Sequence, residues 1–275
     1  MNPRYAVFGQ PVAHSLSPRI HAMFGAQLGI AVDYRAVEVG HADFARALEE
    51  FARDGGVGAN ITLPLKTDAF ALCAVRSARA QRCGSVNTLV RGGDAWHGDS
   101  TDGIGFLRDL ARLGFEARGR RVLLLGAGGA ARAVAFALAD AGVHELMLVN
   151  RTRQRIAELK RALRSDSAFG CDLAQVDTLD GHYDLLVNAT SAGHGGGAAL
   201  ELPPRLLERD ALCYDLSYGR AAQSFLAWAR ETGAKVANDG LGMLVEQAAE
   251  SFAIWHGRRP DAGAVLAALR RESIP

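Results

Sequence analysis

Several residues of the first 102 have side chains that could do chemistry on a small polar ligand. They are Ser15, Ser17, Asn60, Thr62, Lys66, Asn87, Thr101 and Asp102. Small hydroxyl and amide side chains suit a ligand that carries several hydroxyl groups. Lys66 could hold a carboxylate or take part in proton transfer, and Asp102 could keep that lysine charged or accept a hydrogen bond.

Each of these residues also has a purely structural interpretation. Ser17 and Asp102 could cap helices. Asn87 could be a turn residue, and Lys66 could be a solvated surface lysine. Most of the set lies at or just after the end of a predicted strand, which is the edge of an open α/β sheet where ligands bind. Their joint placement favours a ligand site, and the residue types alone leave both interpretations open.

A second candidate site lies in the middle of the chain, where a glycine-rich turn separates two apolar runs. Residues 122–125 predict a buried strand, 126–131 have the pattern G-x-G-x-x-A, and a predicted helix precedes the next apolar run, 146–149. Gly126 permits a tight turn, and Gly128 lets the backbone approach a pyrophosphate that also meets the helix N-terminus. This spacing predicts one half of a dinucleotide-binding βαβ unit, with a merely structural glycine turn as the alternative.

The end of the second apolar run indicates which dinucleotide binds. An NAD-binding unit usually places Asp or Glu there, whereas this chain has Asn150, Arg151 and Thr152, then Arg153 and Arg155. A carboxylate would repel the 2′-phosphate of NADP, and an arginine can pair with it through two hydrogen bonds. NADP is therefore favoured over NAD, with a solvated basic helix start as the alternative.

The elements that must position these residues alternate between strand and helix over the whole chain. Strands are predicted near 5–8, 32–39 and 58–62, a hairpin over 86–97, and further strands near 184–187 and 212–216. Helices are predicted between them. They include one capped by Ser17, one capped by Asp43, one near Lys66, and the segments 104–113, 224–231 and 240–256. This alternation predicts an α/β protein with mainly parallel sheets.

Composition limits the function further. The 275 residues allow two domains, and 31 Lys and Arg against 30 Asp and Glu leave no net field for nucleic acid or an anionic membrane. The start lacks a signal-peptide pattern, and no apolar stretch approaches membrane-spanning length. Four cysteines without a C-x-x-C pair indicate no metal site and no disulfide framework. We therefore expect a cytoplasmic protein.

The candidate site residues belong to motifs that together resemble the shikimate dehydrogenase family over essentially the whole chain. The motifs occupy 8–11, 14–18, 58–66, 84–89, 98–103, 126–132, 150–152, 188–191, 214–218 and 239–247. The chain departs from the pattern at Ser85 and Ser100, where Ala and Asn are common, and at His21, where Asn is frequent. None of these departures removes a predicted catalytic group.

The resemblance implies NADPH-dependent reduction of 3-dehydroshikimate to shikimate, with Lys66 and Asp102 as the catalytic pair. It also implies two sets of binding residues. The substrate set is Ser15, Ser17, Asn60, Thr62, Asn87, Tyr218 and Gln247. The cofactor set is Gly126, Ala127, Gly128, Gly129, Ala130, Asn150, Arg151, Thr152, Arg155, Thr190, Ser191, Leu216, Gly240 and Met243.

The same resemblance implies two domains with the active site in the cleft between them. Because Gln247 belongs with the substrate residues, the expected substrate domain is 1–102 plus 240–275, and the expected Rossmann-type NADP domain is 103–239. A quinate dehydrogenase that uses NAD and a non-catalytic NADP-binding sensor are the alternatives. The expected partner is shikimate or 3-dehydroshikimate, with no nucleic acid and no membrane, for a monomer or homodimer.

Overall fold

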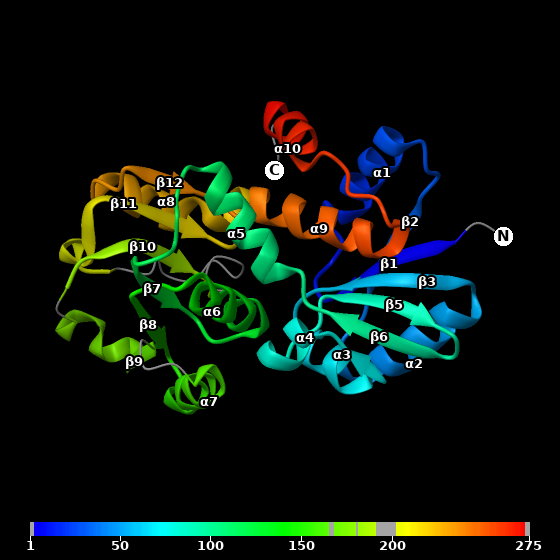
Figure 1. Ribbon diagram of the computed structural model, residues 1–275, viewed down its shortest axis with the longest axis horizontal. Helices are drawn as coiled ribbons and strands as arrows, with labels where there is room; N and C mark the ends of the chain where they lie inside the picture. The colour runs from blue at the N-terminus through cyan, green and yellow to red at the C-terminus, as the bar shows by residue number, and fades with distance from the viewer. Residues whose placement is uncertain (1–2, 165–167, 180, 191–201, 273–275) are drawn as a thin grey trace. The chain divides into compact units, whose positions relative to one another are not determined.

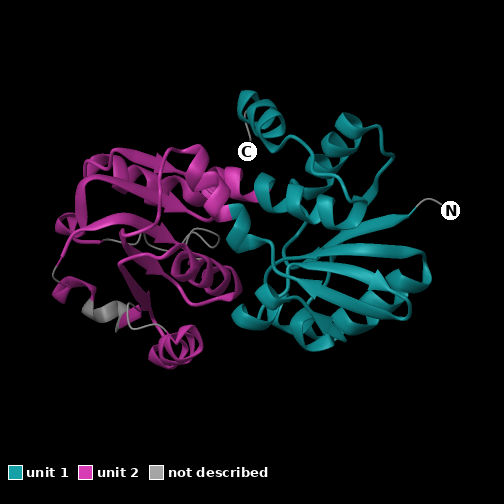
Figure 2. Cartoon of the chain, viewed as in Figure 1, with its two compact units in different colours: residues 1–105, 245–272 teal, residues 106–244, 273–275 magenta. Residues whose placement is uncertain are grey.

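The chain folds into two compact units (Figure 1; Figure 2). The computed structural model describes residues 3–164, 168–179, 181–190 and 202–272. Unit 1 contains Met1–Gly105 and Val245–Glu272, and unit 2 contains Phe106–Leu244. Both boundaries fall inside helices, α5 (Asp102–Arg112) and α9 (Leu241–His256). Ser191 and the glycine-rich segment 194–199 lie outside the described residues.

Unit 1 is built on a six-stranded mixed sheet. Its strands are β1 (Arg4–Gly9), β2 (Asp33–Glu38), β3 (Gly56–Ile61), β4 (Val75–Arg76), β5 (Thr88–Gly92) and β6 (Ala95–Asp99), in the order β2-β1-β3-β5-β6-β4. β1 pairs in parallel with β2 and β3, and β4 pairs in parallel with β6. The predicted hairpin, β5–β6, is confirmed, and it pairs antiparallel to β3. It therefore places two antiparallel pairings in a sheet that we expected to be mainly parallel.

Helices cover both faces of this sheet (Figure 1). They are α1 (Ser17–Leu28), α2 (His41–Arg53), α3 (Lys66–Leu72), α4 (Ala78–Cys83), α10 (Ala262–Arg271) and the later turns of α9. Phe44, Leu48 and Phe51 of α2 pack with Phe8 of β1 in one core. The prediction that Asp43 caps α2 is wrong, because the helix already begins at His41.

Unit 2 is built on a six-stranded parallel sheet. Its strands are β7 (Arg121–Leu125), β8 (Glu145–Asn150), β9 (Ala168–Asp172), β10 (Tyr183–Asn188), β11 (Leu207–Asp215) and β12 (Val236–Asn238), in the order β12-β11-β10-β7-β8-β9. All its pairings are parallel. The first three strands run in one direction across the sheet and the last three in the other, which is the doubly wound order of dinucleotide-binding domains. The order reverses between β7 and β10, the place where such sheets bind ligands.

The helices of unit 2 follow its strands. They are α6 (Gly129–Ala141), α7 (Arg153–Leu163) and α8 (Gln223–Glu231), with short 3-10 segments η1 (Leu173–Thr178), η3 (Pro204–Leu206) and η4 (Gly219–Ala222). The last four residues of β7, 122–125, are all buried, which confirms that an apolar run without alternation marks a strand covered on both faces. The predicted strand–turn–helix–strand unit is therefore present as β7, α6 and β8.

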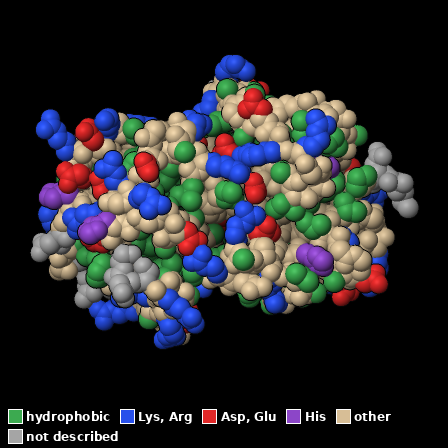
Figure 3. Space-filling view, viewed as in Figure 1, with side chains coloured by type: hydrophobic (Ala, Val, Ile, Leu, Met, Phe, Trp, Pro, Cys, Tyr) green, Lys and Arg blue, Asp and Glu red, His purple; other side chains and the backbone are tan. Residues whose placement is uncertain are grey.

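Surface charge is mixed in sign. Lys and Arg side chains are interspersed with Asp and Glu side chains on the face drawn in Figure 3. Among the helices of the described residues, none has the length and apolarity that crossing a bilayer requires.

Candidate active site

Lys66 and Asp102 form an ion pair inside unit 1. Lys66 is the first residue of α3, the helix that follows β3, and Asp102 is the first residue of α5, the helix that follows β6. Lys66 Nζ lies 2.5 Å from Asp102 Oδ2, and the two side chains are only 12% and 6% exposed. Such a charge-assisted hydrogen bond is strong and directional. The interpretation of Lys66 as a solvated surface lysine is therefore wrong.

Asn87 is the residue before β5, and its buried side chain contacts this ion pair. Its Oδ1 accepts a hydrogen bond from the Thr101 backbone N–H at 2.8 Å, and its Nδ2 donates to Asp102 Oδ1 at 2.8 Å. A backbone N–H can only donate and an ionised carboxylate can only accept, so the two partners determine the orientation of this amide. Asn87 is therefore a buried, oriented donor and not a turn residue at the surface.

Gln247 reaches the same cluster from α9. Its Oε1 accepts a hydrogen bond from Asn87 Nδ2 at 3.1 Å and lies 3.3 Å from Thr101 Oγ1. These two residues are 160 positions apart in the sequence, so only the fold brings them into contact. Asp102, Asn87 and Gln247 thus form one continuous set of polar side chains around Lys66.

Ser15, Ser17 and Thr62 lie beyond the carboxyl ends of two adjacent parallel strands, β1 and β3. Ser17 is the first residue of α1, its backbone N–H donates to Ser15 Oγ at 3.3 Å, and the residue that caps the helix is Leu16. The interpretation of Ser17 as a helix cap is therefore wrong. The backbone N–H of Thr62 donates to the Phe8 carbonyl at 2.9 Å and so ties the two strand ends together.

Asn60 differs from the other substrate candidates because the protein itself engages both ends of its amide. Its Oδ1 accepts from the Tyr34 hydroxyl at 2.8 Å, and its Nδ2 lies 3.0–3.3 Å from the Asn87 carbonyl, Thr88 Oγ1 and Ser251 Oγ. Burial raises the pKa of Tyr34 well above its usual value, so its hydroxyl remains a donor. Asn60 therefore has the geometry of a supporting amide.

The cofactor candidates gather at the point where the strand order of unit 2 reverses. Gly126 has φ +108°, and a Cβ there would lie 2.8 Å from the Ala189 carbonyl oxygen, so this turn after β7 requires glycine. Thr190 follows β10, and its hydroxyl donates to Asn188 Oδ1 at 2.7 Å. The turn after β7 and the end of β10 are therefore in direct contact.

The start of α6 fits an anionic group. Gly128 is its N-cap residue, with no side-chain cap and no acidic residue in the first turn, and the turn 126–130 contains Ala127, Gly129 and Ala130. A Cβ built on Gly128 meets no described atom within 4 Å. There is thus room beside Gly128 at the start of this helix, which suits a dinucleotide pyrophosphate at a helix N-terminus.

Asn150, Arg151, Thr152 and Arg155 lie between β8 and the first turn of α7. Asn150 Nδ2 donates to the Thr152 carbonyl at 3.1 Å, which closes the turn. Arg151 and Arg155 are exposed, and neither has an ion pair with any residue in the described ranges. Two guanidinium groups at the end of the second strand fit a phosphate on the ribose.

Leu216, Gly240 and Met243 also belong to unit 2. Gly240 packs so closely on the Leu216 carbonyl that a Cβ would collide with it. Met243 is buried in the first turn of α9, and its backbone N–H donates to the Tyr214 hydroxyl at 3.3 Å. Tyr218 lies after β11, in unit 2, whereas the other substrate candidates lie in unit 1.

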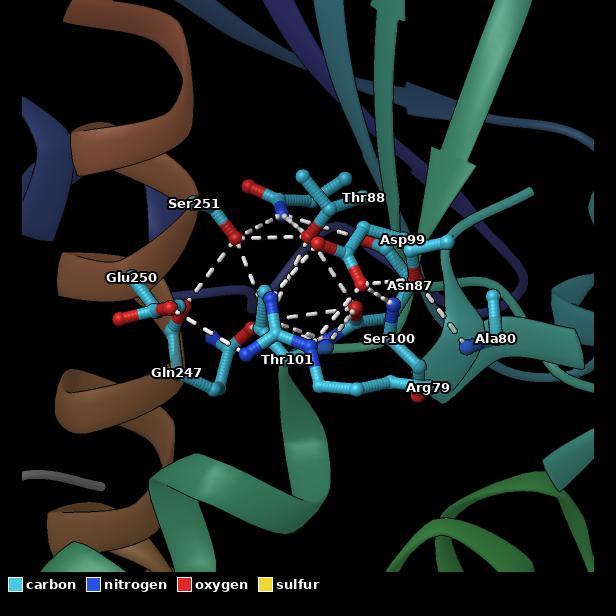
Figure 4. A network of polar contacts seen from close by, with 12 residues as sticks. Arg79, Ala80, Asn87, Thr88, Asp99, Ser100, Thr101, Gln247, Glu250 and Ser251 are labelled. Carbon is cyan, nitrogen blue, oxygen red and sulfur yellow. Dashed lines mark hydrogen bonds and ion pairs between the residues drawn. The ribbon is translucent and has the colours of Figure 1, made fainter. Parts of the chain in front are cut away.

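Sequence reasoning did not select Thr88 and Ser251 (Figure 4). Together with Asn60, Asn87, Thr101, Asp102 and Gln247 they form what we call the polar cluster of unit 1. Ser251 follows Gln247 by four residues, so helical periodicity alone would have placed both on one face of α9. The Tyr214–Asp109 pair of unit 2 was also missed. Its two residues are 105 positions apart, and no short-range pattern joins them.

Comparison with known proteins agrees with this geometry. The family model described as the shikimate dehydrogenase substrate binding domain matches residues 7–89, shikimate / quinate 5-dehydrogenase matches 109–195, and the shikimate 5'-dehydrogenase C-terminal domain matches 240–270. A relative from Stenotrophomonas maltophilia named shikimate dehydrogenase (NADP(+)) is 55% identical over 99% of this chain and 98% of its own length. The chain belongs to the shikimate dehydrogenase family.

Other relatives and solved structures of the family agree. A Xanthomonas campestris protein of the same name is 56% identical over 97% of this chain and 95% of its own length. The Thermus thermophilus shikimate 5-dehydrogenase, solved in complex with NADP(H) and shikimate, has a TM-score of 0.84 and 37% identity, covering 98% of this chain and 99% of that one. An Ael1 enzyme from Pseudomonas putida has a TM-score of 0.89 and 40% identity, covering 98% of both chains.

No metal centre emerges from the part of the chain that the structure describes, since no group of three or more His, Cys, Asp or Glu side chains there could hold an ion. The side chains of Cys73, Cys83 and Cys213 are buried. Burial raises the pKa of Cys73 to about 11 and that of Cys213 to about 12, so both are protonated packing residues at neutral pH.

Proposed function

We propose that this protein is an NADP-dependent shikimate dehydrogenase that interconverts 3-dehydroshikimate and shikimate. The observation that carries the proposal is the Lys66–Asp102 ion pair, joined through Asn87 to Gln247, inside a chain of this family. A buried lysine held by a carboxylate is the group that such a reaction needs. The named relatives support both the reaction and the cofactor.

Lys66 is the proposed proton donor in the direction of reduction. The bound cofactor supplies a nicotinamide that transfers hydride to the substrate ketone. The oxygen that becomes negative as hydride arrives must be stabilised or protonated by a nearby acid, and the Lys66 ammonium is such an acid. Asp102 accepts a hydrogen bond from the ammonium and directs Nζ, while Asn87 holds the other carboxylate oxygen. In oxidation the same lysine takes the proton.

Substrate recognition is assigned to side chains with small hydroxyl and amide groups. Ser15, Ser17 and Thr62 lie at the carboxyl edge of β1 and β3, where they would hold the carboxylate and ring hydroxyls. Asn87 and Gln247 would bind ring hydroxyls beside Lys66. Tyr218 is assigned one further hydroxyl contact from unit 2, and Asn60 supports the others from behind.

Cofactor binding is assigned to unit 2. The turn 126–130 would take the pyrophosphate on its backbone N–H groups, and Arg151 and Arg155, with Asn150 and Thr152, would take the 2′-phosphate and ribose. Thr190, Leu216, Gly240 and Met243 would line the nicotinamide side, and Ser191 is carried over from the family pattern alone. Unit 1 is then the substrate-binding domain and unit 2 the NADP-binding domain. A cytoplasmic location and a monomeric or dimeric state stay predictions.

The test is initial-rate formation of reduced cofactor with shikimate or quinate, each against NADP and NAD. Fast turnover only with shikimate and NADP is the expected result. Comparable rates with quinate or NAD would replace the substrate or cofactor assignment with the alternative that the shikimate / quinate family model leaves open. A folded protein that binds NADP but turns over none of the pairs would be a sensor, and the proposal would be wrong.

A further inference from the structure

Ser251 lies at the centre of the polar cluster of unit 1 without any role in the scheme above. It is fully buried in α9, one helical turn after Gln247. Its Oγ lies 3.0 Å from Asn60 Nδ2, 2.7 Å from Thr88 Oγ1 and 3.1 Å from the Gln247 carbonyl. Figure 4 shows this hydroxyl directed from α9 toward Thr88 on the facing strand. A single hydroxyl therefore connects the helix that carries Gln247 with two strands of the sheet.

Ser251 takes part in these hydrogen bonds both as a donor and as an acceptor. Ser251 has one proton, and the carbonyl of Gln247 can only accept, so Ser251 donates there. Its lone pairs accept from Asn60 Nδ2, and either hydroxyl can donate in its 2.7 Å contact with Thr88. This arrangement aims the Asn60 Oδ1 at the Tyr34 hydroxyl, which donates to it.

The Thr88 hydroxyl connects Ser251 with Asn87. This hydroxyl lies 2.7 Å from Ser251 Oγ and 3.1 Å from Asn87 Oδ1. The Thr88 hydroxyl can donate to Asn87 Oδ1, which also accepts from the Thr101 backbone N–H and hydroxyl, while Asn87 Nδ2 donates to Asp102. The Asn60 amide also donates to the Asn87 backbone carbonyl at 3.2 Å. Both the backbone and the side chain of Asn87 thus depend on residues that Ser251 holds.

We propose that Ser251 is a positioning residue of the substrate site, which orients Asn60 and Thr88 and thereby holds Asn87 beside the Lys66–Asp102 pair. This inference rests on the proposed function. It assigns Ser251 no contact with substrate. Its effect on the reaction passes through side chains that do face the substrate.

The test compares Ser251→Ala with Ser85→Ala. Both substitutions remove one buried serine hydroxyl from unit 1, and the Ser85 hydroxyl has no hydrogen-bond partner among the described residues. We expect Ser251→Ala to lower kcat/KM for shikimate about five- to ten-fold, as for the loss of one buried hydrogen bond, with the KM for NADP unchanged. Ser85→Ala should leave all constants within about two-fold. A folded Ser251→Ala protein with unchanged kcat/KM for shikimate would overturn the proposal.

A second variant separates positioning from a general loss of stability. Thr88→Val keeps the shape of the side chain and removes its hydroxyl. If Ser251 acts through Thr88, the double variant should lose less than the product of the two single losses in kcat/KM for shikimate. A fully multiplicative loss would contradict the proposed route. The parent enzyme is assayed in parallel, so a failure of the proposed function appears as absent turnover in the parent, and the assignment of Ser251 then falls with it.

Discussion

The two candidate sites are built from different parts of the chain. Unit 1 uses buried side chains, and Asn87, Gln247 and Asp102 hold one another through hydrogen bonds of 2.8–3.1 Å. Unit 2 uses the backbone, because its central features are a glycine turn at Gly126 and the uncapped start of α6. A ring with several hydroxyl groups needs donors and acceptors in definite directions, which side chains supply. A pyrophosphate needs several N–H groups at one place, which a helix N-terminus supplies.

This difference predicts which residues of each site are sensitive to mutation. In unit 1 the loss of a single polar group should disturb its neighbours, because each amide is oriented by its partners. At the cofactor site of unit 2 most side-chain substitutions should leave cofactor binding unchanged, except at glycines and at the arginines that select the cofactor. The following predictions test this contrast, from the largest expected effect to the smallest.

Lys66→Ala should lower kcat by about 10²–10⁴, since it removes the proposed proton donor. Lys66→Arg is the matched control for charge, because arginine keeps a cation beside Asp102 but does not release its proton at accessible pH. We expect Arg to restore the free energy of unfolding without restoring kcat. Steady-state rates with shikimate and NADP, together with thermal unfolding, check this. Near-normal turnover in the Ala variant would remove Lys66 from the mechanism.

Arg151→Ala should raise the KM for NADP about ten-fold or more and change the KM for NAD by less than about two-fold, because a charge-assisted pair with the 2′-phosphate is lost. Arg161→Ala, an exposed arginine in the last turn of the same α7, serves as the control and should affect neither cofactor. Equal changes for NADP and NAD would show that Arg151 does not contact the phosphate. Unit 2 would then select its cofactor through another group.

The contrast also explains what could be predicted from the sequence. Glycine spacing depends on neighbours in the chain, so the turn at Gly126 and the helix after it were predictable from a few residues. Lys66, Asn87 and Asp102 were selected because each follows a predicted strand or lies near its end. Their mutual hydrogen bonds, in contrast, join residues at least 15 positions apart, and no local pattern shows them.

Short elements were the hardest to predict. α4 has six residues, and its start is capped by Ser77, whose hydroxyl accepts from the Ala80 N–H. A helix that short is not stable on its own and depends on packing, here against β6. Ser251 was missed for a related reason, because an isolated serine in a buried helix face looks like a small packing residue until its partners are known.

Tyr214→Phe tests whether a side-chain hydrogen bond also matters in unit 2, where the candidate site is built mainly from backbone groups. The Tyr214 hydroxyl donates to Asp109 Oδ2 at 2.6 Å and accepts from the Met243 N–H, and both side chains are fully buried. Burial and the neighbouring charge of Asp109 raise the pKa of Tyr214 well above its usual value, so it stays a donor. Its loss should lower the free energy of unfolding by about 1.5–3 kcal/mol, the value of a hydrogen bond to a charged group.

Denaturant unfolding measures this loss, and the double variant Tyr214→Phe with Asp109→Asn provides the control. Since the two groups act on each other, the double variant should lose less than the sum of the single losses. A KM for NADP that rises in Tyr214→Phe would further show that the pair positions Met243. If the free energy of unfolding does not change, the Tyr214–Asp109 hydrogen bond contributes little to the stability of unit 2.

His21→Phe distinguishes the two units by their response to acid. His21 of unit 1 is fully buried and stacks on Tyr34 with ring centroids 4.4 Å apart, whereas the described histidines of unit 2, His144 and His182, are exposed. Burial lowers the pKa of His21 to about 3, with a smaller opposite effect of the Asn60 side chain and a still smaller lowering by the charge of His256.

The sign of the pH dependence follows from this lowered pKa. The unfolded chain binds a proton at His21 below pH about 6.5, and the folded protein does not until about pH 3. The contribution of neutral His21 to the free energy of unfolding should therefore be present above pH about 6.5 and be lost as the pH falls, with a slope that approaches about 1.4 kcal/mol per pH unit between the two pKa values. His21→Phe keeps the aromatic stack and removes this proton, so its unfolding free energy should change by about 1 kcal/mol less between pH 6.5 and 5.5. Hydrogen exchange at pH 5.5 should show unit 1 loosening before unit 2 in the parent, and an equal response of both units would place the acid sensitivity elsewhere.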